Sequence, residues 1–114
     1  MNLVDLILTE NDFGTVSVQR FQRLFRPISS SLETLHLGKC GIEHVSRQFF
    51  ADLSRLKYLY LYENGLTHLS DGVFDSLKNL RFLDLASNRI AVISSDTFSS
   101  NTRHRLYIIF FSSV

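Results

Sequence analysis

Apolar residues return along this chain at the same relative positions, in a frame that starts at Leu32 and starts again, at equal spacing, at Leu56 and Leu80. Between these positions the residues are mostly polar. A repeat of this kind predicts a solenoid, in which each unit completes its core only against its neighbours. The positions are occupied by Leu32, Leu35, Leu37, Cys40, Ile42, Val45, Phe50 and Leu53; by Leu56, Leu59, Leu61, Asn64, Leu66, Leu69, Phe74 and Leu77; and by Leu80, Leu83, Leu85, Asn88, Ile90, Ile93 and Phe98.

One earlier unit and one later unit extend this pattern. The earlier unit, over 3–31, is longer than the others, and its insertion falls around 25–31. We expect a further unit to begin with Leu106, Ile109 and Phe111. The chain is then a single array over 1–114, with repeats at about 3–31, 32–55, 56–79 and 80–105 and a partial one at 106–114. Solenoids end in polar caps and no cap is visible, so we expect a fragment of a longer array.

Each unit is expected to supply one short strand to a parallel sheet. The alternation at Leu35 and Leu37, and at its equivalents, places one strand face inward. Strands are predicted near 5–8, 34–37, 58–61 and 82–85, with short helices or irregular turns near 20–25, 47–53 and 71–77. The Asn64-Gly65 pair favours a hairpin. The repeat overrides this cue, because its equivalents Cys40-Gly41 and Asn88-Arg89 are not hairpin turns.

The repeated motif is L-x-x-L-x-L-x-x-N-x-L, and the chain therefore resembles leucine-rich repeat proteins. The resemblance implies an α/β horseshoe with a concave parallel sheet. The unit length and its phenylalanine are similar to the repeats of extracellular receptors. The insertion in the first unit and the sequence Ser-Leu-Glu-Thr-Leu-His-Leu at 31–37 resemble those of Toll-like receptor ectodomains. That second resemblance implies ligand binding in innate immunity and signal transduction at the extracellular face of a membrane.

One residue at the bend after each strand is expected to bond to the backbone. We call the equivalent residues of successive units the structural ladder. An amide side chain there can satisfy backbone groups that the turn leaves unpaired. We expect both Asn64 and Asn88 to be buried. The phenylalanines of successive units are expected to stack in a column under the convex side. The ladder positions are Asn11, Cys40, Asn64 and Asn88, and the column is Phe21, Phe50, Phe74 and Phe98.

The strand residues between the inward leucines are the candidate ligand-binding residues. Three of the four tyrosines fall on one strand, and tyrosine is enriched in binding surfaces. The alternative is that these side chains form ordinary cross-strand contacts that stiffen the sheet. Lys39 and Glu63 would be charges at the rim. The outward strand positions are Asp5, Ile7, Thr9, Thr34, His36, Gly38, Tyr58, Tyr60, Tyr62, Phe82, Asp84 and Ala86, and we expect Ile108 and Phe110 to continue them. The candidates for ligand binding among these are Thr34, His36, Tyr58, Tyr60, Tyr62, Phe82 and Asp84.

The net charge and the composition limit the classes of molecule that the chain is expected to bind. A net charge of +1 indicates neither a nucleic acid nor an anionic membrane, so a protein ligand is expected. No apolar run approaches the roughly 18 residues of a membrane span. The single cysteine excludes an intrachain disulfide, which fits a cytosolic protein or a piece of a secreted one. We find neither a signal peptide nor an Asn-x-Ser/Thr sequon.

No catalytic motif accompanies the repeats, and we expect neither an enzyme nor a cofactor or metal. Cys40 is either a reactive thiol or a small buried substitute for asparagine. His44 and His68 occupy the same position of successive units and should lie side by side. They could form a metal or pH-sensing site, or two solvated loop histidines.

Two functions remain open at this stage. The first is a recognition module from the ectodomain of a Toll-like receptor, which the repeat length and the insertion favour. The alternative is a cytoplasmic leucine-rich repeat scaffold for protein–protein interaction, favoured by the missing signal peptide, sequons and cysteine caps. An enzyme with appended repeats would need a catalytic domain outside this sequence.

Overall fold

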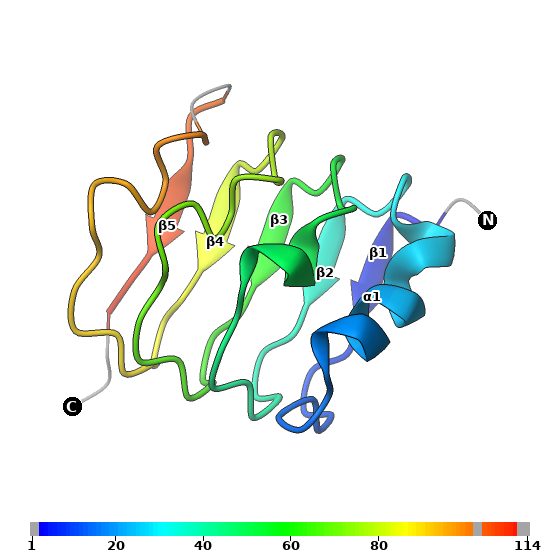
Figure 1. Cartoon of the computed structure of the whole chain (residues 1–114), viewed down its shortest axis with the longest axis horizontal. Coiled ribbons are helices and arrows are strands. Elements are labelled where there is room, and N and C mark those ends of the chain that lie inside the picture. Colours follow the sequence, from blue (N-terminus) through cyan, green and yellow to red (C-terminus); the bar gives the residue numbers. More distant parts are fainter. Residues whose placement is uncertain (1–2, 102–103, 112–114) are drawn as a thin grey trace.

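The computed structural model describes residues 3–101 and 104–111, and these form one solenoid built on a five-stranded parallel sheet. The strands lie side by side in sequence order (Figure 1). The predicted fold is confirmed. The Asn64-Gly65 hairpin does not form; the Gly65 N–H instead donates to the Ile42 carbonyl of the preceding coil, at 2.9 Å. The strands are β1 (Asp5–Ile7), β2 (Thr34–His36), β3 (Tyr58–Tyr60), β4 (Phe82–Asp84) and β5 (Tyr107–Ile109).

The sheet register aligns the central residues of successive strands. Leu35 pairs with Leu59, and Leu59 pairs with Leu83. All three side chains are fully buried. Because side chains alternate along a strand, their neighbours must point to the opposite sheet face. The core therefore lies on one side of the sheet only.

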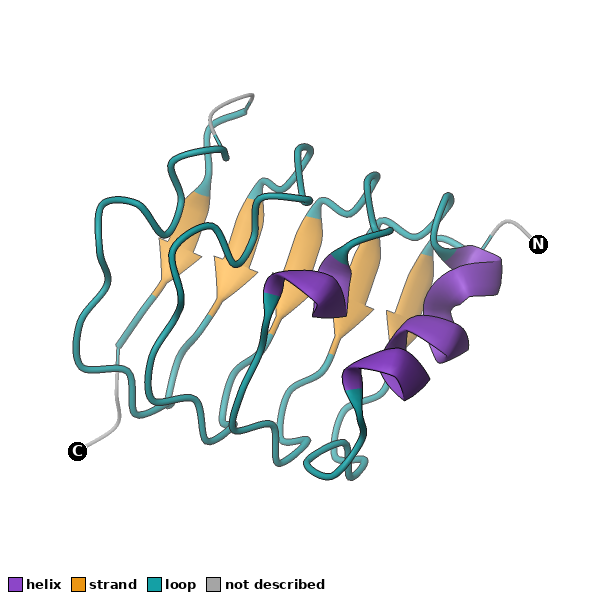
Figure 2. Cartoon of the chain, viewed as in Figure 1, coloured by secondary structure: helices purple, strands orange, loops and turns teal. Residues whose placement is uncertain are grey.

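The opposite wall of the core is formed by short helices and turns (Figure 2). The longest is α1 (Val18–Phe25), which begins after Ser17, whose Oγ accepts a hydrogen bond from the Arg20 N–H at 3.2 Å. The 3₁₀ helix η1 (Arg26–Ile28) follows it directly, so the extra residues of the first unit extend this helical segment. The second coil has only η2 (Arg47–Phe50), and later coils have turns. This agrees with the short helices or irregular turns that the sequence predicts.

A column of phenylalanines runs through the solenoid beneath this wall, as predicted. The ring centroids of Phe21 and Phe50 are 6.3 Å apart, those of Phe50 and Phe74 5.9 Å, and those of Phe74 and Phe98 5.6 Å. Phe49, which the sequence analysis did not include, packs against Phe21 with centroids 4.5 Å apart. Aromatic contacts therefore join the first four coils to one another.

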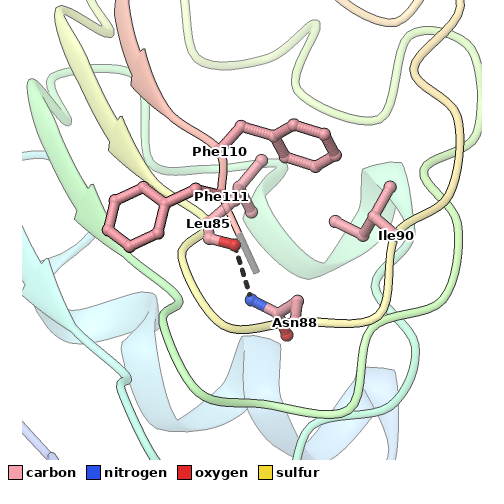
Figure 3. A pocket seen from close by; sticks show the side chains of 5 residues that line it. All are labelled: Leu85, Asn88, Ile90, Phe110 and Phe111. Carbon is pink, nitrogen blue, oxygen red and sulfur yellow. Dashed lines mark hydrogen bonds between the residues drawn. The ribbon is translucent and has the colours of Figure 1, made fainter. Parts of the chain in front are cut away.

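The last coil has a different register from the predicted one. Leu83 pairs with Ile108, whereas a unit that starts at Leu106 would pair it with Ile109. A slip of one residue exchanges the two faces of a strand. The expectation that Ile108 and Phe110 lie on the concave side is therefore wrong. Figure 3 shows Phe110 pointing toward Ile90 and Phe111 pointing the opposite way.

The preceding convex loop accommodates another departure from the repeat. Asn101 stands where earlier units have Leu53 and Leu77, yet it is buried. Its Nδ2 donates hydrogen bonds to the Phe74 carbonyl at 2.9 Å and to the Leu77 carbonyl at 3.0 Å. The amide thus replaces apolar packing with bonds to the coil before it.

Candidate functional site

Asn64 ties its own coil to the preceding one. Its Oδ1 accepts hydrogen bonds from the N–H groups of Cys40 at 2.9 Å and Ile42 at 3.1 Å. Its Nδ2 donates to the carbonyls of Leu37 and Leu61, each at 3.0 Å. One side chain therefore bonds to backbone groups of both coils, and among the described residues it is the hydrogen-bond partner of the Cys40 and Ile42 N–H groups and of the Leu37 carbonyl.

Asn88 repeats this arrangement one coil later. Its Oδ1 accepts from the Leu66 N–H at 3.2 Å, and its Nδ2 donates to the Leu61 carbonyl at 2.9 Å. Asn88 is buried, but Asn64 is only half-buried, so the expectation that both are buried is wrong for Asn64. Asn64 lines an open cavity of about 330 Å³, through which solvent reaches it. Asn11 is exposed and donates one bond, to the Leu8 carbonyl at 3.0 Å.

Cys40 takes the ladder position of the second coil. It is 1 % exposed, and its Sγ donates to the carbonyls of Leu8 at 3.2 Å and Gly38 at 3.4 Å. Burial raises the pKa of the thiol, although backbone N–H groups of Glu10 and Asn11 act in the opposite direction. Of the two alternatives, the geometry favours the small buried substitute for asparagine.

A row of charges lines the turns that follow the strands. Glu10, Lys39 and Glu63 occupy equivalent positions, and each has a positive φ, between 50° and 66°. The Lys39 Nζ lies 3.5 Å from a Glu10 carboxylate oxygen and 3.9 Å from one of Glu63. These side chains are largely exposed, so each pair contributes at most about 1 kcal/mol. Lys39 is thus flanked by two carboxylates at the rim of the sheet.

All seven candidate binding residues lie on the sheet face turned away from the core. The register places Thr34, Tyr58 and Phe82 in one row across the strands. A second row contains His36, Tyr60 and Asp84. We call this surface the concave face; it comprises Asp5, Ile7, Thr9, Thr34, His36, Gly38, Tyr58, Tyr60, Tyr62, Phe82, Asp84, Ala86, Tyr107, Ile109 and Phe111.

The centre of the concave face is a continuous run of aromatic rings. His36 and Tyr60 stack with their centroids 4.3 Å apart and their planes only 3° from parallel. On its other side Tyr60 contacts Phe82, with centroids 5.4 Å apart and planes at 49°. All three side chains are half-buried, so each ring has one part held by neighbours and another in solvent.

Tyr58 and Tyr62 differ in their accessibility. Tyr58 is exposed at the start of β3. The Tyr62 ring lies over the backbone of Gly38, where a Cβ would collide with it. The Tyr62 side chain therefore packs against the preceding coil as well as facing the binding surface, and the sequence analysis did not predict this contact.

The charge on the concave face is negative. It contains the carboxylates of Asp5 and Asp84 but no lysine or arginine. The Oδ1 of Asp84 accepts a hydrogen bond from the Ala86 N–H at 3.0 Å, which holds the carboxylate in place. Within residues 3–101 and 104–111, Asp84 has no ion-pair partner.

Sequence analysis missed three residues of this surface. Tyr107, Ile109 and Phe111 belong to it because of the register of β5. A frame in which Ile108, rather than Ile109, continues the inward row of Leu83 would have identified them. Phe111 also borders, with Phe110, a cavity of about 250 Å³ at the end of the sheet (Figure 3).

His44 and His68 lie side by side on adjacent coils, as their spacing predicts. Their ring centroids are 6.1 Å apart, and both are exposed. In the described part of the chain, no group of three His, Cys, Asp or Glu residues is placed to hold a metal ion. The same residues include no helix long and apolar enough to cross a membrane.

Comparison with known proteins identifies the repeat. A family model described as leucine rich repeat matches residues 30–90. The chain is similar to TLR13 in the TLR13–ssRNA13 complex, with 25% identity and a TM-score of 0.66 over 98% of this chain. It is similar in fold to a chain of the Toll–Spatzle complex, a molecular hub in Drosophila development and innate immunity, with 19% identity and a TM-score of 0.76 over 95% of this chain. The matches cover 14% of each of those chains, and no curated protein matches the sequence.

Proposed function

Because the chain belongs to the leucine-rich repeat family, we propose that it is a recognition module that binds a protein on its concave face rather than an enzyme. The observation that supports this most is the aromatic run of His36, Tyr60 and Phe82. Aromatic rings offer a large contact area and lose little conformational entropy on binding. Rings that already stack on each other in the free protein are ordered before a partner arrives, which lowers the cost of association.

The finer proposal is a ligand-binding segment of a Toll-like innate-immune receptor, located at the extracellular side of a membrane. The insertion in the first unit and the likeness to the TLR13 and Toll chains support it. In this proposal residues 1–114 are one array within a longer ectodomain. The signalling role and the membrane attachment then reside in parts of the receptor outside this sequence.

A protein fits the concave face better than a nucleic acid does. The TLR13 chain was solved with ssRNA and the Toll chain with Spatzle, so both classes of partner occur among similar structures. A nucleic acid is held mainly by lysine and arginine contacts to its phosphates. The concave face offers no such side chain and carries two carboxylates.

The decisive experiment compares variants of the two sides of the solenoid in binding to a partner identified by cross-linking. Tyr60→Ala and Phe82→Ala should each weaken binding at least about tenfold, as central aromatic residues of interfaces do. The control is Lys78→Ala, an exposed residue of the convex side. Loss of binding in the control with retention in both aromatic variants would overturn the proposal. In that case the rings only stiffen the sheet.

The alternative of a cytoplasmic scaffold is tested by location. The full-length product of the gene that encodes these residues should be labelled on intact cells by a biotin reagent that cannot cross membranes. A cytosolic protein of known location serves as the control. Labelling only after lysis would reject the receptor and favour the scaffold.

A further inference from the structure

Two aromatic residues and one acidic residue occupy neighbouring positions on the concave face. Tyr60 of β3 and Asp84 of β4 are register partners, so their Cβ atoms are about 5 Å apart. Phe82 precedes Asp84 by two residues on the same strand and therefore shares its face. The Phe82 and Tyr60 ring centroids are 5.4 Å apart. Asp84 therefore occupies the position next to Tyr60 on the neighbouring strand and two residues from Phe82 on its own strand.

The three side chains are held in position before any ligand binds. The parallel stack of His36 supports the Tyr60 ring from the β2 side. The Ala86 N–H fixes one oxygen of Asp84 at 3.0 Å. The other oxygen, Oδ2, has neither a hydrogen bond nor an ion pair within the described residues. Asp84 is half-buried, so its charge is only partly solvated and would gain from a cation.

We propose that Tyr60, Phe82 and Asp84 form a subsite for the cationic side chain of an arginine or lysine in the protein that binds the concave face. A cation within about 6 Å of an aromatic centroid is attracted by the ring, and more strongly when it is partly desolvated. A guanidinium can at the same time donate to the free Asp84 oxygen. This inference rests on the proposed function and adds the chemistry of the partner.

The charges of the concave face also favour a partner with a cationic side chain at this subsite. The concave face itself contains no lysine or arginine that pairs with Asp84. At the rim, Lys39 is flanked by Glu10 and Glu63. At the other ends of the strands, Lys57 pairs with Glu33 at 3.1 Å, and the Arg105 Nη1 donates to the Tyr107 hydroxyl at 3.5 Å. Arg81 is exposed before Phe82. The face therefore fits a basic segment with apolar residues on either side of its cation, which would cover Tyr58 and Ile109.

The test uses a matched pair of synthetic peptides and the complete chain. One peptide alternates arginine with leucine; the other has citrulline, a neutral isostere, in place of arginine. Binding is followed by NMR of the ¹⁵N-labelled protein. The arginine peptide should bind at least about fivefold more tightly, and its largest shifts should include the Ala86 amide, which contacts Asp84.

Two variants separate a local effect from a change in net charge. Asp84→Asn keeps an acceptor for the Ala86 N–H and should reduce arginine binding to the level of citrulline. Asp52→Asn removes the same charge from an exposed position beyond η2 and should leave both affinities unchanged. Equal binding of the two peptides, or equal weakening by both variants, would overturn the subsite.

Failure of the subsite differs from failure of the proposed function. If Tyr60→Ala abolishes binding of the cross-linked partner while Asp84→Asn has no effect on either ligand, the face binds proteins without this cation contact. If the peptide pair discriminates but Tyr60→Ala leaves the partner bound, the subsite stands and the proposed function fails. Tighter binding of a uridine oligonucleotide than of the arginine peptide at Tyr60 and Phe82 would reject both.

Discussion

The ring of Tyr62 lies on the backbone of Gly38, one coil away, in the space that a Cβ at residue 38 would occupy. Gly38 does not have a positive φ, so its backbone would accept any side chain. The glycine is therefore required by the ring and not by the turn. We predict that Gly38→Ala lowers the free energy of unfolding by about 1–3 kcal/mol, because a tightly packed site has to shift. Chemical denaturation measures this value.

A double-mutant cycle checks the cause. In a Tyr62→Ala background the same Gly38→Ala change should cost well under about 1 kcal/mol, since the ring no longer fills the space. An undiminished cost in that background would show that Gly38 is required for another reason.

Asn64 should be a major determinant of the junction between the second and third coils. Asn64→Leu leaves two N–H groups and the Leu37 carbonyl without their partner, and we predict a loss of about 1–3 kcal/mol in unfolding free energy. Asn11→Leu is the matched control, because Asn11 is exposed and makes one such bond. Equal melting temperatures for Asn64→Leu and the parent would contradict the assigned role.

The phenylalanine column predicts a graded response to truncation. Phe50 is fully buried and contacts Phe21, Phe49 and Phe74. Phe50→Ala should cost about 3–5 kcal/mol. Phe98 is half-buried and, within the described part of the chain, stacks only on the ring of Phe74, so Phe98→Ala should cost clearly less. Denaturant midpoints of the two variants give the order, and the reverse order would contradict it.

The fold could be predicted from the sequence because one repeat specifies it several times. Leu35, Leu59 and Leu83 each mark the same position, so an error at one site is corrected by the others. The placement of the seven binding candidates follows from the same alternation. A feature that occurs in only one unit has no equivalent elsewhere in the chain against which its prediction can be checked.

The features that sequence analysis missed are of that single-occurrence kind. The loop between Phe98 and Ile108 has Asn101 at a leucine position, and the pattern alone did not reveal whether Ile108 or Ile109 continues the inward row. The contact of Tyr62 with Gly38 depends on a side-chain direction that spacing does not encode. The aromatic stack of His36 on Tyr60 likewise depends on ring orientation.

Cys40 occupies a ladder position, and its burial there suppresses the reactivity of its thiol. The thiolate is the reactive form of cysteine, and burial raises the pKa of this thiol above its ordinary value of 9.0. As the pH rises, the unfolded chain therefore ionises first. The stability that the neutral buried thiol contributes is present below that ordinary pKa and decreases as the pH rises above it.

We therefore predict that Cys40 reacts with iodoacetamide on the order of 100-fold more slowly in the folded chain than in denaturant, because reaction requires local opening. Mass spectrometry at successive times gives both rates. A variant carrying Cys40→Ala and Ser95→Cys is the control, because residue 95 is exposed and its thiol should react at nearly the same rate in both states. A folded-state rate for Cys40 equal to that of the control would mean that the thiol is accessible, and the ladder position would then not require a buried side chain.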